Sequence, residues 1–391
     1  MKIGIDIRSV GENRTGDEVY VLNLVRALEK IDSSNQYFLF CDKPQSELES
    51  LRALIFPGKE SGKNFSLVSV LPKSKAFWTF FSLPLHLKKN PVDILHVQYI
   101  VPFLLPIKAR IITTIHDISF NFFPRHIRKS DLLFLKSLIP LSLKKAWRVI
   151  GVSAFTAKAI RKYYSLKKGK VRAVNNGGAA EEFFHPVGPE ERLAVRKKYG
   201  LSGKYLLSVG TLQPRKNIPF LMEAFCRFKR EKRADPAVGD LILAIGGNRQ
   251  AANFDREIEA AEKRLFQQYP EMREKIKFLG FIDQKDLPAL YQEAEIFCFP
   301  SLYEGFGLPL LEAMASGTPV LCSDSSCFPE IAGPAASFFS QNDSDDFTKK
   351  LFEIIIDPEK KNELIIKGKK RAADFSWEKC AKETLKVYQD V

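Results

Sequence analysis

Short runs of consecutive apolar residues alternate along this chain with longer stretches in which apolar residues recur every three or four positions. The short runs are typical of strands buried on both faces, and the longer spacing is typical of amphipathic helices. In the first half of the chain, the expected strands are 2–7, 37–41, 93–97, 111–115 and 149–152, and the expected helices are 19–30, 131–146 and 154–164. Strands that alternate with helices predict a parallel sheet covered by helices on both faces.

The alternation pauses at a turn-rich break between Asn176 and Pro189 and then starts again. Strands are expected at 205–210, 241–245, 276–279, 296–299 and 320–322, with a helix at 218–231 after the first of them. The pattern predicts an α/β protein of two doubly wound domains, 1–185 and 186–374, which suits a length of 391 residues. In such sheets ligands bind beyond the carboxyl ends of the strands, so a site is expected in the loops that follow them.

The composition is that of a globular protein, with 45% hydrophobic and 27% charged residues. No apolar stretch approaches the roughly 20 residues that a membrane-spanning helix needs, and the first residues are typical of a strand rather than a signal peptide. The six cysteines are scattered without a CxxC pair, which disfavours a disulfide scaffold or a structural zinc site. These features predict a cytoplasmic protein.

The net charge of +14 is confined to the first half of the chain. Residues 1–185 hold 29 basic and 15 acidic side chains, whereas 186–391 hold 31 of each. Within the first half, 61–172 has 21 basic residues against three aspartates. Such a field attracts nucleic acid, anionic lipid or phosphorylated substrates, and composition alone does not choose among them.

The segment 301–319 combines a glycine-rich loop with the expected start of a helix. Gly305 and Gly307 allow the backbone to approach a ligand closely. The N-terminus of the helix offers free amide groups to an anion. Glu304 and Glu312 are placed to accept hydrogen bonds from hydroxyl groups at two ends of one ligand.

The pair Glu304 and Glu312 resembles the E-x7-E motif of GT-B retaining glycosyltransferases, and the surrounding segment is similar to glycosyltransferase family 4. Six further stretches resemble motifs of that family, in the expected order: 115–117, 152–153, 176–177, 209–217, 278–281 with 286–291, and 375–378. The resemblance implies a GT-B fold, in which two Rossmann-like domains face each other across a cleft. The first would bind the acceptor and the second the nucleotide sugar, and a terminal helix, 375–391, would pack back onto the first.

By this resemblance the donor site comprises Gly16, Gly210, Arg215, Lys216, Phe281, Glu304, Gly305, Phe306, Gly307, Leu308 and Glu312. Glu312 would bind the ribose hydroxyls, and Glu304 would hold hydroxyls of the donor sugar. Arg215 and Lys216 would bind the diphosphate, whose negative charge increases as it leaves. The catalytic residues would be His116, Arg215, Lys216 and Glu304, with His116 near the reacting carbon of the sugar.

No metal or other cofactor is expected. The near match to an Asp-x-Asp metal motif is 343–346, an acidic surface turn late in the chain. The cation role would fall to Arg215, Lys216 and the helix terminus.

The first domain departs from the family where a Gly-x-Gly-Arg-like loop is usual after the first strand. Gly16 fits the pattern, but Glu18 stands where a second glycine is usual. Because a carboxylate cannot cradle phosphate, Glu18 is expected to meet acceptor hydroxyls instead. The other acceptor-side candidates are Asp117, which is expected to support the preceding histidine, and Ser153.

Residues 73–89 place aromatic side chains between lysines. Such a segment suits an interfacial helix at an anionic membrane, and it equally suits a helix that packs against the core with solvated ends. The sequence leaves both open. With the basic excess of 61–172, the first alternative would make the chain a peripheral protein at the inner face of the cell membrane.

These observations favour a retaining, metal-independent glycosyltransferase that moves a hexose from a GDP-mannose or UDP-glucose type donor to a saccharide acceptor. The mannosyltransferase branch is slightly nearer, and a lipid-linked glycan of cell-surface polysaccharide synthesis suits the basic first domain. A nucleotide-sugar epimerase of the same fold is the alternative, and a basic nucleic-acid-binding protein is the alternative from another class. No nucleic-acid partner is expected, because no reader motif is found. A dehydrogenase is set aside, because no Gly-x-Gly-x-x-Gly follows the first strand.

Overall fold

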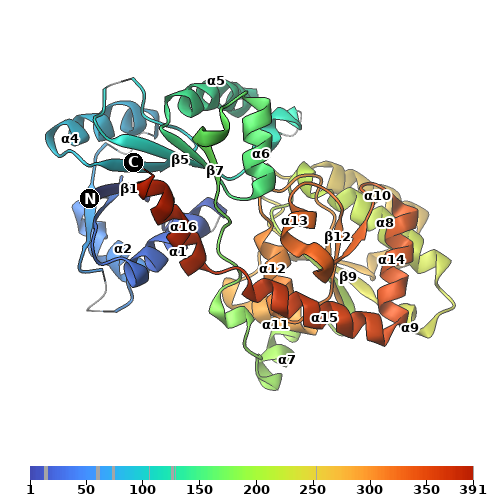
Figure 1. The fold of residues 1–391 in the computed structure, drawn as a ribbon. Helices are drawn as coiled ribbons and strands as arrows, with labels where there is room; N and C mark the ends of the chain where they lie inside the picture. The colour runs from blue at the N-terminus through green and yellow to red at the C-terminus, as the bar shows by residue number, and fades with distance from the viewer. Residues whose placement is uncertain are drawn as a thin grey trace. The chain divides into compact units, whose positions relative to one another are not determined.

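The computed structural model describes residues 1–12, 16–58, 62–72, 75–104, 106–124, 127, 129–251 and 253–390. The chain forms two compact units (Figure 1). The first unit comprises Met1–Phe122, Lys129–Gly177 and Phe375–Val391, and the second comprises Phe123–Arg128 and Gly178–Asp374. Arg14 and Thr15, which directly precede Gly16, lie outside the described residues, as do Lys73 and Ser74 at the start of the segment 73–89 and Val391 at the end of 375–391.

The first unit is built on a seven-stranded parallel sheet in the order β3-β2-β1-β4-β5-β6-β7. Its strands are β1 (Lys2–Asp6), β2 (Gln36–Cys41), β3 (Phe65–Ser69), β4 (Ile94–Gln98), β5 (Arg110–Ile115), β6 (Arg148–Gly151) and β7 (Val171–Ala173). Its helices are α1 (Gly16–Ile31), α2 (Leu48–Ile55), α3 (Lys75–Phe77), α4 (Leu83–Lys89), α5 (Lys129–Lys145), α6 (Ala154–Tyr163) and α16 (Trp377–Gln389). A π-helical stretch, Trp78–Ser82, joins α3 to α4.

The strand order determines which face of this sheet each helix covers. Connections between parallel strands are right-handed, so α1 and α2, which lead toward β2 and β3, lie on one face. The helices α4, α5 and α6 lead across the sheet in the opposite direction and therefore lie on the other face. Figure 1 shows α4 and α5 above the sheet, and α1, α2 and α16 below it.

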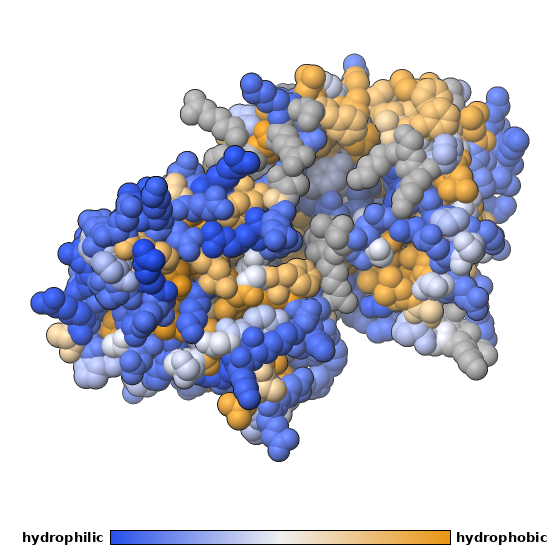
Figure 2. All heavy atoms as spheres, turned by 180° about the vertical axis from the view of Figure 1, so that it is seen from behind, coloured by the Kyte–Doolittle hydropathy of each residue, from blue (hydrophilic) through white to orange (hydrophobic). Residues whose placement is uncertain are grey.

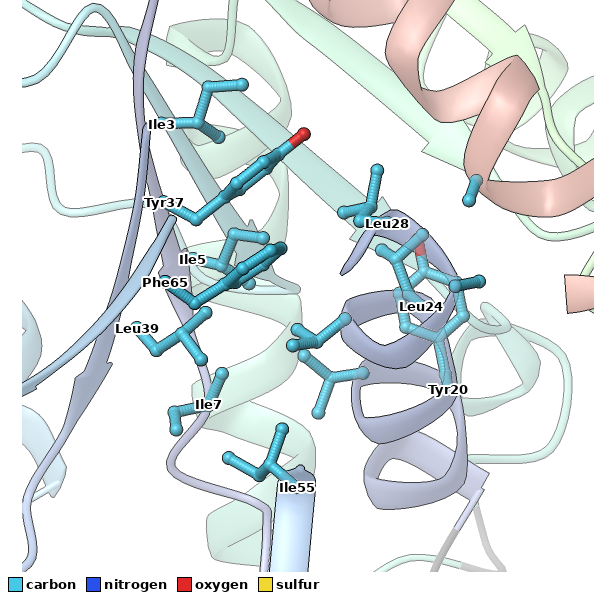
Figure 3. Packing of buried hydrophobic residues seen from close by; sticks show 14 of the residues in the cluster. Ile3, Ile5, Ile7, Tyr20, Leu24, Leu28, Tyr37, Leu39, Ile55 and Phe65 are labelled. Atoms are coloured by element: carbon cyan, nitrogen blue, oxygen red, sulfur yellow. The ribbon is translucent and has the colours of Figure 1, made fainter. Parts of the chain in front are cut away.

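A hydrophobic core of the first unit lies between the sheet and α1 (Figure 3). The helix presents Tyr20, Leu24 and Leu28 at helical spacing, and β1 presents Ile3 and Ile5 by strand alternation. Each of these side chains is at most 1% exposed. Because burying one such side chain contributes about 1.5–3 kcal/mol, this contact fixes α1 with its first turn at the carboxyl edge of the sheet.

The C-terminal helix α16 packs on the first unit. Trp377 covers Gly177, where an added Cβ would lie 2.2 Å from the indole ring. Farther along, the Tyr388 hydroxyl lies 2.7 Å from Nδ1 of His96, and Nε2 of His96 lies 2.8 Å from the Thr114 hydroxyl. Burial lowers the pKa of His96 to about 3, so a neutral imidazole bridges the two hydroxyls at pH 7. The glycine at position 177 therefore has a packing role under the indole.

We expect Gly177→Ala to destabilise the first unit, because the added methyl group must displace the Trp377 ring. Overpacking of this kind costs about 1–3 kcal/mol. The matched control is Gly169→Ala in the same unit, where an added Cβ meets no atom within 4 Å. Thermal unfolding checks both variants, and a Gly177→Ala protein as stable as the control would show that α16 shifts without cost.

The second unit is built on a six-stranded parallel sheet in the order β10-β9-β8-β11-β12-β13. Its strands are β8 (Tyr205–Val209), β9 (Ile242–Gly246), β10 (Ile276–Gly280), β11 (Ile296–Phe299), β12 (Val320–Ser323) and β13 (Ser337–Phe339). Its helices are α7 (Pro189–Lys198), α8 (Ile218–Glu231), α9 (Pro236–Gly239), α10 (Glu257–Gln268), α11 (Leu287–Glu293), α12 (Leu308–Ala315), α13 (Phe328–Ala332), α14 (Ser344–Ile356) and α15 (Pro358–Ala373). The prediction of an α/β protein with two doubly wound parallel sheets is confirmed.

The apolar pattern does not predict three strands, β3, β7 and β13. All three lie at an edge of their sheet, and each has partly or fully exposed positions, so their apolar runs are short and broken. All six cysteines are buried free thiols. Within the part of the chain that the structure describes, no helix has the length and apolar character to cross a membrane.

Candidate active site

The strand order of the second sheet reverses between β8 and β11. Ligands of doubly wound sheets bind at such a point, beyond the carboxyl ends of the strands. The loop after β8 carries Gly210, Arg215 and Lys216, and the loop after β11 carries Glu304. A hydrogen bond of 2.8 Å from the amide of Leu302 to the carbonyl of Arg215 joins the two loops. The fold thus brings together two motifs that are far apart in the sequence.

Arg215, Lys216 and Glu304 form a charge cluster at this edge. Nη1 of Arg215 lies 2.9 Å from Oε2 of Glu304, and Nζ of Lys216 lies 2.5 Å from Oε1 of the same carboxylate. Arg215 also donates a hydrogen bond of 3.0 Å to the carbonyl of Tyr303. Glu304 is 7% exposed and Lys216 is 8% exposed. The carboxylate therefore holds both cations in fixed positions.

The cluster is charged at neutral pH. Burial alone would raise the pKa of Glu304, but the attraction of Arg215 and Lys216 outweighs burial and holds the pKa at about 2. Two cations and one anion leave these three side chains with a net positive charge of one. Fixed cations of this kind are suited to bind an anionic oxygen ligand.

The loop after β11 ends at Gly307, directly before α12. Its φ of 92° lies in the left-handed region that favours glycine, and an added Cβ would crowd the Phe328 ring at 3.1 Å. Gly305 and Phe306 precede it and are buried, and Leu308 is the first residue of α12. The free amide groups at the start of α12 therefore follow Glu304 within four residues of the chain.

Glu312 lies one turn into α12 and is in a different state from Glu304. Its Oε2 accepts a hydrogen bond of 3.2 Å from the Tyr291 hydroxyl. Burial raises the pKa of Glu312 to about 7; the bond from Tyr291 lowers it, and the nearby charge of Glu182 adds to the rise. Near neutral pH this carboxyl is therefore divided between its two forms, whereas Glu304 is ionised.

Two further donor-site candidates lie at other strand ends of this sheet. Gly210 follows β8, and an added Cβ there would lie 3.6 Å from Cε of Lys216, so the lysine side chain passes over the glycine. Phe281 follows β10 and is 70% exposed. An exposed ring beyond a strand end is available to stack on a nucleotide base.

In the first unit, His116 follows β5 and lies beside Gln98 at the end of β4. Nε2 of His116 lies 2.7 Å from Oε1 of Gln98 and 3.7 Å from Oδ1 of Asp17. The rings of Tyr20 and His116 meet edge to face, with their centres 4.9 Å apart. Burial lowers the pKa of His116, although Asp17 and Asp117 act to raise it, so the imidazole is neutral at pH 7. Donation from Nε2 to Gln98 then leaves Nδ1 as an acceptor.

Two acceptor-side candidates are engaged in hydrogen bonds with residues two or three positions later in the chain. Oδ1 of Asp117 accepts hydrogen bonds from the amide and the hydroxyl of Ser119, at 2.9 Å and 2.7 Å. The side chain that fixes His116 is therefore Gln98, and Asp117 acts on the imidazole through its charge. Ser153 is fully buried, and its hydroxyl accepts a hydrogen bond of 3.0 Å from the amide of Thr156 at the start of α6.

Glu18 and Gly16 lie in the first turn of α1. Oε1 of Glu18 accepts a hydrogen bond of 2.8 Å from the amide of Gly11, and the residue is 6% exposed. Among the described residues, Oε2 of Glu18 is buried without a hydrogen-bond partner. An added Cβ at Gly16 would meet no atom within 4 Å. One oxygen of Glu18 thus binds the backbone at Gly11. The contact of Glu18 with an acceptor stays a prediction.

Comparison with known proteins identifies the family. Residues 191–371 match the family model for group 1 glycosyl transferases, and residues 14–180 match the model for glycosyltransferase family 4. Over 291 residues the chain is 32% identical to O-antigen chain mannosyltransferase B of Escherichia coli, which covers 73% of this chain and 72% of that protein. This chain belongs to the group 1 glycosyltransferases.

Solved structures confirm the GT-B fold of this glycosyltransferase. Sucrose-phosphate synthase from Thermosynechococcus elongatus matches with a TM-score of 0.74 and 22% identity, covering 100% of this chain and 98% of that chain. HepE of Anabaena, solved in complex with UDP-glucose, matches with a TM-score of 0.73 and 14% identity, covering 100% of both chains. The glycosyltransferase has the fold and family that its motifs predict.

Three residues of the glycosyltransferase that contact candidate site residues were not indicated by the motifs. Gln98 directly follows the expected strand 93–97, and its place at a strand end was the one feature of the sequence that pointed to a role in the site. Tyr20 lies in α1, two residues after Glu18, and Tyr291 ends the motif stretch 286–291, but nothing in the sequence shows that a tyrosine would meet His116 or Glu312. Their contacts depend on how the helices pack.

Proposed function

We propose that this glycosyltransferase transfers a mannosyl group from GDP-mannose to a saccharide acceptor, with retention at the anomeric carbon and without a metal. The observation that carries the proposal is the charge cluster of Arg215, Lys216 and Glu304, at the point where the second sheet reverses its strand order. A nucleoside diphosphate is the ligand class that suits both this position and this charge.

The cluster supports departure of the diphosphate. As the bond from the anomeric carbon to the phosphate oxygen breaks, negative charge develops on the diphosphate, and preorganised cations lower the barrier to this step. Glu304 keeps Arg215 and Lys216 in place because it stays ionised far below neutral pH. We assign to the same carboxylate the hydrogen bonds to hydroxyls of the donor sugar.

For retention we propose attack from the face that the leaving group vacates. The bond from the acceptor oxygen to the anomeric carbon forms as the bond to the phosphate oxygen breaks, and the acceptor proton passes to a phosphate oxygen. This route needs no protein nucleophile. The enzyme then contributes positioning and charge stabilisation.

Metal independence is supported by two features. Arg215 and Lys216 supply the positive charge that a metal would otherwise bring to the diphosphate. The acidic stretch 343–346 is engaged in helix capping, since Oδ1 of Asp343 accepts hydrogen bonds of 3.0 Å from the amides of Asp345 and Asp346 at the start of α14.

The choice of mannose and of acceptor is supported by the relative from Escherichia coli, which is named an O-antigen chain mannosyltransferase. We therefore propose a growing, lipid-linked polysaccharide as the acceptor. The complex of HepE with UDP-glucose supports a nucleotide sugar as the donor class on this fold.

Thermal unfolding with a panel of nucleotide sugars tests the donor. We expect GDP-mannose and GDP to raise the melting temperature, because a ligand that binds only the native state adds about 2.7 kcal/mol at a concentration 100 times its Kd. UDP-glucose and UDP serve as controls. Stabilisation by the uridine ligands alone would overturn the choice of donor.

Transfer assays test the chemistry. We expect an α-linked product from the α-linked donor, and turnover that EDTA leaves unchanged. A β-linked product would overturn retention, and loss of turnover in EDTA would overturn metal independence. Conversion of the nucleotide sugar without any acceptor would favour the epimerase alternative.

A further inference from the structure

Exposed apolar side chains of the described residues concentrate in the basic part of the first unit. Of 17 large apolar side chains that are exposed, ten lie between positions 71 and 163: Leu71, Phe77, Phe81, Leu85, Leu104, Phe122, Leu133, Phe134, Leu141 and Tyr163. Single exposed apolar residues are ordinary, but such a concentration indicates an interaction surface. Figure 2 shows apolar surface gathered at the top of the first unit in that view, over the region where Figure 1 places α5 and α4.

The helical stretch from α3 to α4 has two apolar sides. Trp78 and Leu83 are fully buried in the core. Phe77, Phe81 and Leu85 recur every four residues, are 48%, 38% and 52% exposed, and the two aromatic rings stack with centres 5.1 Å apart. The described part of segment 73–89 therefore packs against the core and also presents an apolar stripe to solvent.

The helix α5 repeats this arrangement on the same face of the sheet. Ile139 and Leu143 are fully buried, whereas Leu133, Phe134 and Leu141 are 71%, 45% and 48% exposed. Exposed lysines accompany both stripes, and they are Lys88, Lys89, Lys129, Lys136, Lys144 and Lys145. Against these lysines, the sequences of α4 and α5 contain one acidic residue, Asp131.

We infer that the exposed face of α4 and α5 docks on an anionic lipid bilayer. Apolar side chains flanked by lysines suit a surface whose interior is apolar and whose headgroups are negative. The same face would fit poorly against a second copy of itself, because the lysines of the two copies would be brought together. Charge complementarity therefore favours a bilayer.

The position of the two apolar stripes links this face to the acceptor. This step of the inference rests on the proposed function. α5 begins after the loop that follows β5 and runs back from the carboxyl edge of the sheet, so Leu133 and Phe134 lie in its first turns near that edge. His116 lies at the same edge of the same sheet. A bilayer against this face would present a lipid-linked saccharide beside the candidate acceptor residues.

Co-sedimentation with phospholipid vesicles tests the inference. We expect the full chain to bind phosphatidylglycerol-containing vesicles at low salt, to bind phosphatidylcholine vesicles at least tenfold more weakly, and to lose binding as salt screens the lysines. The variant Leu133→Glu/Phe134→Glu should lower binding at least tenfold. The matched control is Leu193→Glu on α7 of the second unit, whose leucine is 69% exposed and which should bind as the wild type does.

A pair of charge-reversal variants measures the contribution of the lysines to vesicle binding independently of the apolar side chains. Lys136→Glu/Lys145→Glu should weaken binding to anionic vesicles at least tenfold, whereas Lys349→Glu/Lys370→Glu, at exposed lysines of the second unit, should leave it unchanged. Absence of vesicle binding, or equal losses in test and control variants, would overturn the inference. Light scattering that showed a wild-type dimer and monomeric variants would also overturn it, in favour of contact between copies.

Turnover with a water-soluble saccharide acceptor distinguishes a failure of the docking inference from a failure of the proposed function. All four variants should transfer to that acceptor at the wild-type rate, and only the two α5 variants should lose transfer to an acceptor embedded in vesicles. Loss of transfer to the water-soluble acceptor in the α5 variants would place these residues in the active site and overturn the docking role. Vesicle binding without transfer to any acceptor would support docking while overturning the proposed function.

Discussion

Lys216→Ala should lower kcat roughly 100- to 1,000-fold, the cost of removing one preorganised group that stabilises developing charge. The ammonium of Lys216 lies 2.5 Å from Glu304 at the strand ends where the diphosphate is proposed to bind. Its loss removes positive charge from the leaving group as the sugar–phosphate bond breaks. Single-turnover kinetics with GDP-mannose would measure the effect on the chemical step.

The control for this variant is Lys263→Ala, an exposed lysine of α10. The fold of Lys216→Ala should persist, because Arg215 still pairs with Glu304 at 2.9 Å. Lys216→Arg should restore part of the rate, since it returns the charge with a different shape. A Lys216→Ala enzyme that is folded and turns over at the wild-type rate would show that the charge cluster does not stabilise the leaving group.

Glu312→Gln should make the protein more stable at pH 8 and weaker in donor binding. The pKa of Glu312 is about 7 in the folded protein, above its ordinary value of 4.5, so ionisation of this carboxyl destabilises the fold. The resulting loss of folding stability grows as pH rises from 4.5 to 7 and amounts to about 3 kcal/mol at pH 8. Glutamine removes the ionisation and can still accept the hydrogen bond from Tyr291, so the variant should melt higher at pH 8 and like the wild type below about pH 4.5.

The same substitution should weaken GDP-mannose binding roughly 10- to 100-fold, because a hydrogen bond to a charged acceptor contributes about 1.5–3 kcal/mol. Wild-type affinity should fall as pH drops below 7 and Glu312 takes up a proton, whereas the affinity of the variant should be flat. Calorimetric titration with the nucleotide sugar at several pH values measures the affinity of each protein. The diphosphate of the nucleotide sugar has no proton to lose in this pH range, so a change in affinity reports on the protein. Equal affinity for the two proteins would remove Glu312 from the donor site, and a lower melting temperature at pH 8 would contradict its raised pKa.

Most of the fold could be predicted from the apolar pattern because central strands of a parallel sheet are buried on both faces. The central strands β9 and β11 are unbroken apolar runs for this reason. The strands β3, β7 and β13 have a neighbour on one side alone, and their partly exposed positions can be polar. The three strands that the pattern misses are therefore all edge strands, whereas the fourth edge strand, β10, is predicted because Phe278 and Leu279 keep its apolar run.

The candidate site was predictable as a set of residues and not as a set of contacts. The motifs single out Arg215, Lys216 and Glu304, but they do not show that one carboxylate lies between the two cations. That contact forms because β8 and β11 are neighbours in the sheet, a property of strand order. Likewise, Gln98 meets His116 because β4 and β5 are adjacent, which no local pattern contains.

The packing of α16 on the first unit has a consequence for the order in which the protein is made. Residues 1–177 leave the ribosome before Trp377 and Tyr388 have been translated. Gly177 and His96 then lack the ring and the hydroxyl that cover them until the whole of the second unit has been synthesised. The second unit draws its sheet from the continuous stretch 178–374 and can complete it earlier. The part of this enzyme that is translated first is therefore finished last.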